Sequence, residues 1–372
     1  MLTLASLFDG IGGWLIAAHR NGIKPVWSSE IEDFPMKVSK AHFPDVEQLG
    51  DVTKINGGKV PPVDIICAGS PCQDLSVAGN QKGLAGSRSN LFFESVRIVR
   101  EMREATNGIY PKFFVWENVT GAFSSNHGHD FQAVLREIAE TDIPMPGTGR
   151  WAKAGMVRSE RVGIAWRVLD AQYWGVPQRR SRIFLIADFA EKNRCAAEVI
   201  FVEQSVPRDL EKSGTTGKEV ASFSRIGTEA SSGDCKLAYC IAGNVINRKD
   251  KNGGHHLGVD ENKEVPLYDI SHLSDGVREI PMGASNTLTA HMGTGGGNVA
   301  VLNEADRQKT DDARTVRRLT VTECERLQGL PDGYTAYGSD TARYKALGNG
   351  MAQPCADFII SKVVEAFEKD DS

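Results

Sequence analysis

Two side chains that can take part in covalent and acid–base chemistry follow short apolar runs of this sequence. Cys72 comes after Ile65–Ala68 and the tripeptide Gly69–Pro71, and Glu117 directly follows Pro111–Trp116. Such runs are typical of strands in a parallel sheet, and chemistry in α/β proteins collects beyond the carboxyl ends of these strands. The pattern therefore predicts a nucleophilic thiol and a proton-donating carboxyl group at one edge of a sheet.

The residues around Cys72 add to this prediction, since a cysteine at a strand end is by itself a weak indication of reactivity. Pro71 fixes its own φ and disfavours the helical conformation at Ser70, so the chain leaves the strand in one direction. The polar, glycine-rich segment 74–90 follows. Long aperiodic loops in compact domains are usually functional, and we expect this one to close over a substrate.

A glycine-rich turn near the amino terminus predicts a nucleotide-binding unit. The apolar run Leu2–Phe8 leads into Asp9–Gly13 and then into a helical pattern over Trp14–His19. Glycines let the backbone approach a ligand closely, and the amides at a helix start attract anions. Glu30 ends the next apolar run, Pro25–Ser29, where a carboxylate is placed to accept hydrogen bonds from ribose hydroxyls.

Further alternation of helical and strand patterns predicts an α/β, Rossmann-like fold. Asp51 lies in a brief strand over Val46–Val52, where it can accept from an adenine amino group or cap the next element. We expect helices over Phe34–Phe43, Leu91–Met102, Phe131–Ala139, Ile164–Tyr173 and Pro354–Phe367, and a strand over Ile183–Ala187.

Composition narrows the class of protein. The 372 residues carry a net charge of −5, so nucleic-acid binding needs a local basic patch, and positions 150–182 hold eight Lys and Arg against two acids. The seven scattered cysteines do not form a disulfide framework, which favours a reducing cytosol. The sequence has no secretory signal pattern and no apolar run long enough to span a membrane.

The character of the chain changes near residue 188. Glycine, serine and asparagine become frequent, and the apolar runs are short, as at Asn298–Leu302. We predict a catalytic and cofactor-binding domain over 1–187, an irregular β-rich domain over 188–340, and a segment 341–372 that packs back on the first domain. Thr320 with Glu323 predicts a capped helix start. Paired cysteine spacing is missing, so no metal site is expected.

With these motifs assembled, the chain resembles the cytosine-C5 DNA methyltransferase family over nearly its whole length. The matching motifs, in the family's order, are Phe8–Gly13, Pro71–Gln73, Glu117–Val119, Gln178–Arg182 and Gly348–Asn349. Asp9 stands where a small residue is common, and Gly350-Met351 replaces the more usual Ser or Thr followed by Val. The resemblance implies an S-adenosylmethionine-dependent methyltransferase fold and makes 188–340 the target-recognition domain.

The resemblance also implies roles for individual residues. Cys72 attacks C6 of a flipped-out cytosine, Glu117 assists at N3, Arg182 contacts O2, and Arg180 orients the site or a phosphate; Gln178 and Asn118 complete the catalytic set. Implied S-adenosylmethionine contacts are Phe8, Asp9, Gly10, Ile11, Gly12, Gly13, Glu30, Ile31, Asp51, Val52, Pro71, Leu91 and Asn349. Expected contacts to double-stranded DNA are Gln73, Ser76, Gln81, Arg88, Thr287, Leu288 and Thr289.

Three alternatives stay open at this point. The same fold can methylate cytosine in tRNA, the glycine turn with Glu30 also suits a Rossmann oxidoreductase, and a silent DNA-binding module leaves Cys72 an ordinary thiol. We expect a monomeric enzyme of the bacterial or phage cytoplasm, in a restriction–modification setting with a separately acting restriction endonuclease as a companion.

Overall fold

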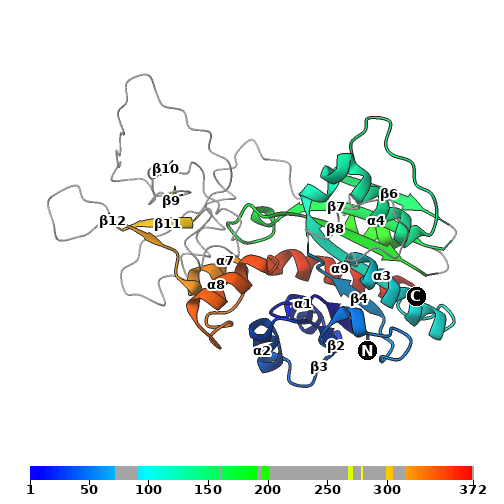
Figure 1. Cartoon of the computed structure of the whole chain (residues 1–372), viewed down its shortest axis with the longest axis horizontal. Helices are drawn as coiled ribbons and strands as arrows, with labels where there is room; N and C mark the ends of the chain where they lie inside the picture. The colour runs from blue at the N-terminus through cyan, green and yellow to red at the C-terminus, as the bar shows by residue number, and fades with distance from the viewer. Residues whose placement is uncertain are drawn as a thin grey trace. The chain divides into compact units, whose positions relative to one another are not determined.

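The computed structural model describes residues 1–71, 91–159, 161–190, 195–201, 267–270, 278–279, 299–304 and 315–370 (Figure 1). The chain forms two compact units: Met1–Leu169, Ser181–Val206 and Cys355–Ser372 make the first, and Asp170–Arg180 with Pro207–Pro354 the second. Several predicted site residues lie outside the described residues, namely Cys72, Gln73, Ser76, Gln81, Arg88 and Thr287–Thr289.

A single sheet organises the first unit, and its described strands lie in the order β3-β2-β1-β4-β5-β8-β7-β6. The strands are β1 Thr3–Leu7, β2 Lys24–Ser29, β3 Glu47–Gln48, β4 Ile65–Ala68, β5 Phe113–Val119, β6 Ala154–Arg158, β7 Gly163–Asp170 and β8 Ser181–Asp188. Strands β1 to β5 are parallel, whereas β8 runs antiparallel to β5. The strand order reverses between β1 and β4, which is where ligands bind in open α/β sheets.

Helices bury both faces of this sheet, as the central strand β5 illustrates. Trp116 contacts Phe92 of α3 (Leu91–Ala105) with ring centres 5.3 Å apart. Phe113, on the opposite face, contacts Phe367 of α9 (Gln353–Asp370) at 5.1 Å. Since alternate side chains point to opposite faces, burial on both sides explains the continuous apolar run of β5. The remaining helices of this unit are α1 Gly13–Arg20, α2 Asp33–His42, α4 His129–Ala139 and α5 Cys195–Ile200.

The helix predicted over Ile164–Tyr173 is wrong. Residues Gly163–Asp170 form strand β7, which pairs with β6, and a short 3-10 helix, Ala171–Tyr173, follows. The run is rich in β-branched and aromatic residues, which favour a strand, and periodicity alone does not separate a short buried strand from a helix. The predicted strand Val46–Val52 is likewise shorter, since only Glu47–Gln48 pair with β2.

The second unit contains an antiparallel sheet and two described helices. Its strands, in the order β10-β9-β11-β12, are β9 Leu267–Ile270, β10 Arg278–Glu279, β11 Val299–Glu304 and β12 Thr315–Arg318, and its helices are α7 Val321–Leu327 and α8 Asp340–Asn349. The predicted cap is confirmed, because Thr320 and Glu323 form a capping box at the start of α7. The domain boundaries predicted from sequence differ from these units, and the roles assigned to the domains stay predictions.

Candidate functional site

An ion pair lies where β5 ends. In the register of β5 and β8, Val119 lies opposite Arg182, and Arg182 Nε is 3.1 Å from Glu117 Oε1. Both side chains are largely buried, with 13% of Glu117 and 16% of Arg182 exposed. A Cβ at Gly69 would lie 3.7 Å from Glu117 Oε2. The carboxylate therefore lies beside the backbone that leads from β4 towards Cys72, and an arginine holds it in place.

The turn that follows β4 is fixed by hydrogen bonds from β5. Asn118 Nδ2 donates to the carbonyl oxygen of Ser70 at 3.0 Å, and Trp116 Nε1 donates to the Ser70 hydroxyl at 3.0 Å. Asn118 Oδ1 in turn accepts from the backbone N–H of Val119 at 2.8 Å. Asn118 thus acts on the residues preceding Cys72. Sequence reasoning missed Ser70 and Trp116 as supports, because their contacts are 46 residues apart along the chain.

The glycine turn after β1 is joined to the end of β2 by Glu30. One carboxylate oxygen of Glu30 accepts from Gly10 N at 2.9 Å, and the other accepts from Ile31 N at 2.8 Å. Phe8, at the turn, has φ +56°, a left-handed conformation that is rare for a side chain of this size and recurs at functional sites. Ile31 is 67% exposed, so an apolar surface is available next to the carboxylate.

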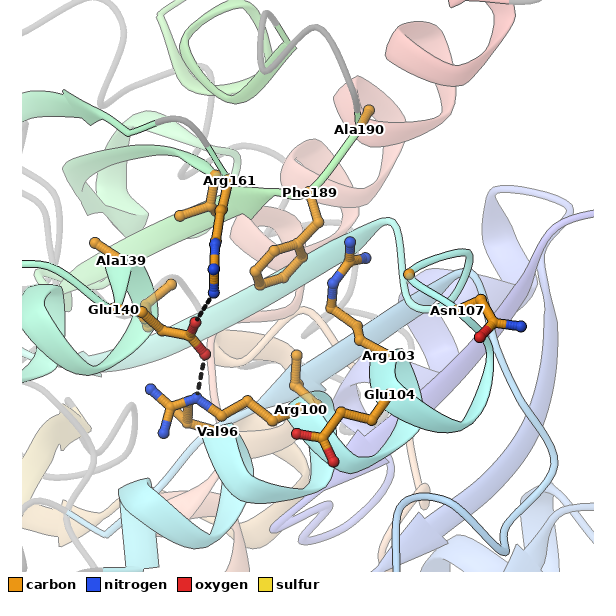
Figure 2. A pocket seen from close by; sticks show the side chains of 14 residues that line it. Val96, Arg100, Arg103, Glu104, Asn107, Ala139, Glu140, Arg161, Phe189 and Ala190 are labelled. Carbon is orange, nitrogen blue, oxygen red and sulfur yellow. Dashed lines mark hydrogen bonds and ion pairs between the residues drawn. The ribbon is translucent and has the colours of Figure 1, made fainter.

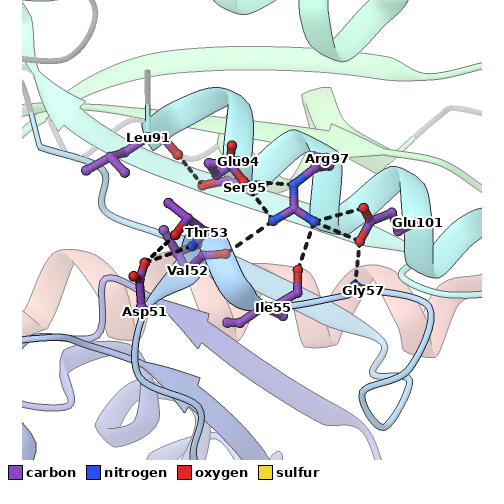
Figure 3. A network of polar contacts seen from close by, with 10 residues as sticks. All are labelled: Asp51, Val52, Thr53, Ile55, Gly57, Leu91, Glu94, Ser95, Arg97 and Glu101. Atoms are coloured by element: carbon purple, nitrogen blue, oxygen red, sulfur yellow. Dashed lines mark hydrogen bonds and ion pairs between the residues drawn. The ribbon is translucent and has the colours of Figure 1, made fainter. Parts of the chain in front are cut away.

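Asp51 and Val52 form the third part of this edge (Figure 3). Asp51 Oδ1 accepts from the backbone N–H and the hydroxyl of Thr53 at 3.0 and 2.8 Å, so it caps the short helix Val52–Lys54. These Thr53 hydrogen bonds lower the pKa of Asp51. The capping alternative is therefore confirmed. The carboxylate still has capacity for another donor, because two oxygens provide about four acceptor sites.

Arg97 of α3 holds the Asp51–Val52 segment in place (Figure 3). Its guanidinium donates to the carbonyl oxygens of Ile55 and Val52 at 2.8 and 3.2 Å. The same group pairs with Glu94 at 2.7 Å and with Glu101 at 2.8 Å, on its own helix. The Arg97 guanidinium is thus held by backbone carbonyl groups of the Val52–Ile55 segment and by carboxylates of its own helix. Nothing in the sequence pattern singled out Arg97, since a charged residue on an amphipathic helix ordinarily faces solvent.

Asp9 is a buried acid at the glycine turn. It is 5% exposed, and its Oδ2 accepts from the Ser39 hydroxyl of α2 at 2.8 Å. Burial raises the pKa of Asp9 to about 7, hydrogen bonds from Ser6 and Ser39 lower it, and the charge of Glu30 raises it further. Asp9 therefore links the turn to α2 and changes charge near neutral pH.

We expect Asp9→Asn to stabilise the protein increasingly as pH rises from 5 to 8. The folded pKa of about 7 exceeds the ordinary value of 3.8, so the stability contributed by neutral Asp9 is present below pH 3.8 and lost as pH rises towards 7. From pH 5 to 8 the variant should gain about 2.5 kcal/mol relative to the unaltered protein.

Urea unfolding at several pH values measures this difference. Asp45→Asn, at an exposed loop position, is the control and should show no comparable pH-dependent gain. A difference between Asp9→Asn and the unaltered protein that stays constant from pH 5 to 8 contradicts the assignment of the buried charge to Asp9.

The second unit holds the predicted residues Gln178, Arg180 and Asn349. Gln178 Nε2 donates to the carbonyl oxygen of Leu327 at 2.9 Å, and Arg180 Nη2 donates to the carbonyl oxygens of Gly348, at 3.3 Å, and Gly350. Arg180 is 3% exposed. It therefore acts on the backbone on either side of Asn349, the last residue of α8. This geometry suits the alternative in which Arg180 orients the site. A part for Arg180 in catalysis stays a prediction.

Cys67 on β4 shows what an unreactive thiol of this sheet is like. It is 0% exposed, and burial together with the charge of Asp9 raises the pKa of its thiol well above the ordinary value. A thiol in this state is a poor nucleophile, because the thiolate is the reactive form. Cys67 is therefore excluded as the nucleophile.

The parallel strands that reverse order beside β1, with a glycine turn and two carboxylates at their carboxyl ends, define a Rossmann-like α/β nucleotide-binding fold. The family model for C-5 cytosine-specific DNA methylases matches residues 2–365. The chain belongs to this family, whose members are DNA (cytosine-5-)-methyltransferases. The family description favours DNA over the RNA alternative and excludes the oxidoreductase.

Curated relatives cover most of the chain. Type II methyltransferase M1.ScrFI of Lactococcus lactis subsp. cremoris is 30% identical over 98% of this chain and 79% of its own length. M.HhaI of Haemophilus parahaemolyticus is 29% identical over 94% of this chain and 90% of its own length. A protein of Escherichia phage P1 named DNA N-6-adenine-methyltransferase is 27% identical. The match covers 98% of this chain and 61% of the length of the phage protein.

Solved structures agree on the fold. S. pombe Dnmt2 methyltransferase superposes with a TM-score of 0.59 and 16% identity, covering 99% of both chains. A Spodoptera frugiperda DNMT2 mutant gives a TM-score of 0.53 at 18% identity, covering 98% of this chain and 99% of its own. At these identities the similarity establishes the fold only. None of the described helices is long and apolar enough to cross a membrane.

Proposed function

We propose that this protein transfers a methyl group from S-adenosylmethionine to C5 of a cytosine flipped out of a specific double-stranded DNA sequence. The observation that carries the proposal is the Glu117–Arg182 pair beside the turn Gly69–Pro71, which follows β4, one of the two strands between which the strand order reverses. There a base and a nucleotide-like cofactor can meet.

The residues at this edge fit the cofactor by their chemistry. The Glu30 carboxylate suits ribose hydroxyls, Asp51 suits an adenine amino group, and exposed Ile31 with buried Val52 supplies apolar contact. The aromatic ring of Phe8 suits a positive sulfonium. S-adenosylmethionine supplies an electrophilic methyl group when bound. The further contacts proposed for Pro71, Leu91 and Asn349 rest on the family resemblance.

The chemistry at the base belongs to the protein's own side chains. C5 of cytosine is too weakly nucleophilic to take a methyl group directly, so we propose that the Cys72 thiolate adds to C6. Glu117 donates a hydrogen bond or a proton to N3, and Arg182 binds the O2 oxygen, so electron density moves towards C5. After methyl transfer, which leaves S-adenosylhomocysteine, a water molecule takes the C5 proton, the Cys72 thiolate is eliminated and N3 returns its proton to Glu117, which restores the aromatic ring.

Stacked neighbours cover both faces of a base in a duplex, so Cys72 can add to C6 only after the cytosine has left the stack, at a cost of a few kcal/mol. We propose that segment 74–90 covers the flipped base and that residues 188–340 select the sequence. The enzyme should act as a monomer on DNA, with a restriction endonuclease acting separately on the same sequence.

The decisive experiment identifies the methylated nucleoside. Purified protein is incubated with labelled S-adenosylmethionine and duplex DNA or tRNA, and the products are digested and separated by mass. We expect 5-methyldeoxycytidine from DNA, and bisulfite sequencing then gives its context. N6-methyldeoxyadenosine, which the name of the phage P1 relative suggests, or a product on tRNA alone contradicts the proposal.

We expect Arg97→Gln to weaken binding of S-adenosylhomocysteine about tenfold, because the carbonyl oxygens of Val52 and Ile55 lose the guanidinium that holds this segment against α3. The rate at saturating cofactor should change little. Isothermal titration calorimetry measures the affinity. Arg100→Gln is the matched control, since Arg100 lies on the same helix, is similarly exposed, and pairs with Glu137 and Glu140 instead. Equal affinities for both variants argue against a positioning role.

A further inference from the structure

A cavity of about 490 Å³ lies in the first unit between α3, α4 and the chain that follows β8 (Figure 2). Phe113, the first residue of β5, is opposite Asp188 of β8, directly before the cavity residues Phe189 and Ala190. The Glu117–Arg182 pair lies towards the other end of these two strands. The cavity therefore belongs to the edge of the sheet opposite the candidate catalytic residues, and a cavity of this volume is in the range of small-molecule sites.

Part of the cavity wall is apolar, and the rest is polar or charged and includes Asn107 and Glu104. The apolar part includes Val96, Val99, Ile138 and Val162, each at most 4% exposed, together with the partly buried ring of Phe189. Apolar walls with a few charged groups are typical of sites for small organic ligands. An inorganic ion alone leaves such a surface unused.

Three arginines line the cavity, and two of them already have carboxylate partners (Figure 2). Glu140 lies 2.8 Å from Arg100 Nε and 2.9 Å from Arg161 Nη1, and Arg100 also pairs with Glu137. These charges largely compensate one another. They form one side of the cavity without leaving a strong unpaired charge there.

Arg103 differs from the other two arginines. Its Nη1 donates to the carbonyl oxygen of Pro111 at 2.7 Å, and its guanidinium carbon lies 4.6 Å from the ring centre of Phe189. Among the described residues it has no carboxylate within ion-pair distance, and Nη2 and Nε make no hydrogen bond. Burial lowers the pKa of Arg103, while the charges of Glu140 and Asp188 act the other way.

Gly108, also in the cavity wall, leaves space next to this guanidinium. A Cβ at Gly108 would have Arg103 Nη2 as its neighbour at 3.5 Å, and φ at this glycine is +81°. The missing side chain keeps the Nη2 donor accessible. The cavity thus combines a half-buried cation with donors to spare and an apolar wall.

We propose that this cavity is a second binding site, which takes a small organic anion whose carboxylate or phosphate pairs with Arg103 and whose apolar or aromatic part packs against the cavity wall. The site is independent of the cofactor and the flipped base, since it lies at the other edge of the sheet.

Phenyl phosphate is a suitable probe, because it joins a phosphate to one ring, and calorimetry on the full chain measures its binding. Arg103→Gln should weaken binding about tenfold or more. Arg136→Gln is the matched control, since Arg136 lies on α4 outside the cavity and pairs with Asp142. Ala190→Trp places a large ring in the cavity while Arg103 is retained, and it should also abolish binding, so the test does not depend on one variant.

Any one of four results overturns the proposal. In the first, phenyl phosphate fails to bind the unaltered protein. In the second, it binds Arg103→Gln and Ala190→Trp as tightly as it binds the Arg136→Gln control. Inorganic phosphate binds as tightly as phenyl phosphate, which removes the role of the apolar wall. S-adenosylhomocysteine displaces the probe competitively, which places it in the cofactor site. Methyl transfer by the Arg136→Gln control confirms that the protein tested is active, independently of these outcomes.

Discussion

Replacement of Cys72 by alanine is expected to abolish methyl transfer, with a fall in rate on the order of 10⁴-fold or more. Without a thiolate at C6, C5 of cytosine stays too weak a nucleophile, and the remaining groups position a base that cannot react. Binding of S-adenosylhomocysteine should persist, because the substitution leaves Pro71 in place and the other groups proposed to hold the cofactor are on other segments. Methylation of duplex DNA and calorimetry measure the two properties separately.

Cys67→Ala is the control for this experiment, since Cys67 is on the strand that leads to Cys72 and its thiol is buried. That variant should keep its methylation rate and lose a little stability from the small cavity. Duplex DNA with 5-fluorocytosine gives a second measurement, because the fluorine blocks the final elimination and leaves a covalent complex. The complex should form with the unaltered protein and with Cys67→Ala only. Full methylation by Cys72→Ala refutes the covalent mechanism.

The strands that carry these residues were predictable because each is buried on both faces. The runs Ile65–Ala68 and Phe113–Trp116 have no polar alternation, and the structure places both in the parallel part of the sheet. The same rule failed for Ile164–Tyr173, since a short apolar run fits a buried helix as well as a strand. Pairing with β6 and β8 decides the strand, and the run itself carries no signal of these two partners.

The supports of the site could not be predicted, because they depend on residues far apart in the chain. Arg97 reaches carbonyl groups 42 and 45 residues away, and Asp9 meets Ser39 across 30 residues. The basic stretch 150–182 is a similar case. It suggested one charged patch, yet Arg180 is buried and Arg182 pairs with Glu117, so these charges have local structural partners. The residue types of the sequence predicted the chemistry of the site. The packing of the folded chain decides which charged side chains have no partner within the protein and so can bind a ligand.

Glu117→Gln is expected to slow methyl transfer by about 10²- to 10⁴-fold while the affinity for S-adenosylhomocysteine stays within about twofold. Glutamine keeps the shape of the Glu117 side chain. Its amide can neither donate an acid proton, as a carboxylic acid can, nor carry a negative charge, as a carboxylate does. Arg182, 16% exposed and 3.1 Å from Glu117 Oε1, then loses its carboxylate and is held less firmly towards the base. Single-turnover methylation of duplex DNA measures the chemical step.

Glu137→Gln is the matched control, because Glu137 also pairs with an arginine, Arg100, and lies away from the turn Gly69–Pro71. It should leave both rate and cofactor affinity unchanged. The comparison separates the general effect of losing an ion pair, seen in Glu137→Gln, from the specific effect of losing the Glu117–Arg182 pair. If Glu117→Gln folds normally but no longer binds S-adenosylhomocysteine, the carboxylate serves the cofactor rather than the base. If both variants slow methylation equally, the Glu117–Arg182 pair is a structural ion pair, and the proton for N3 has to come from another group.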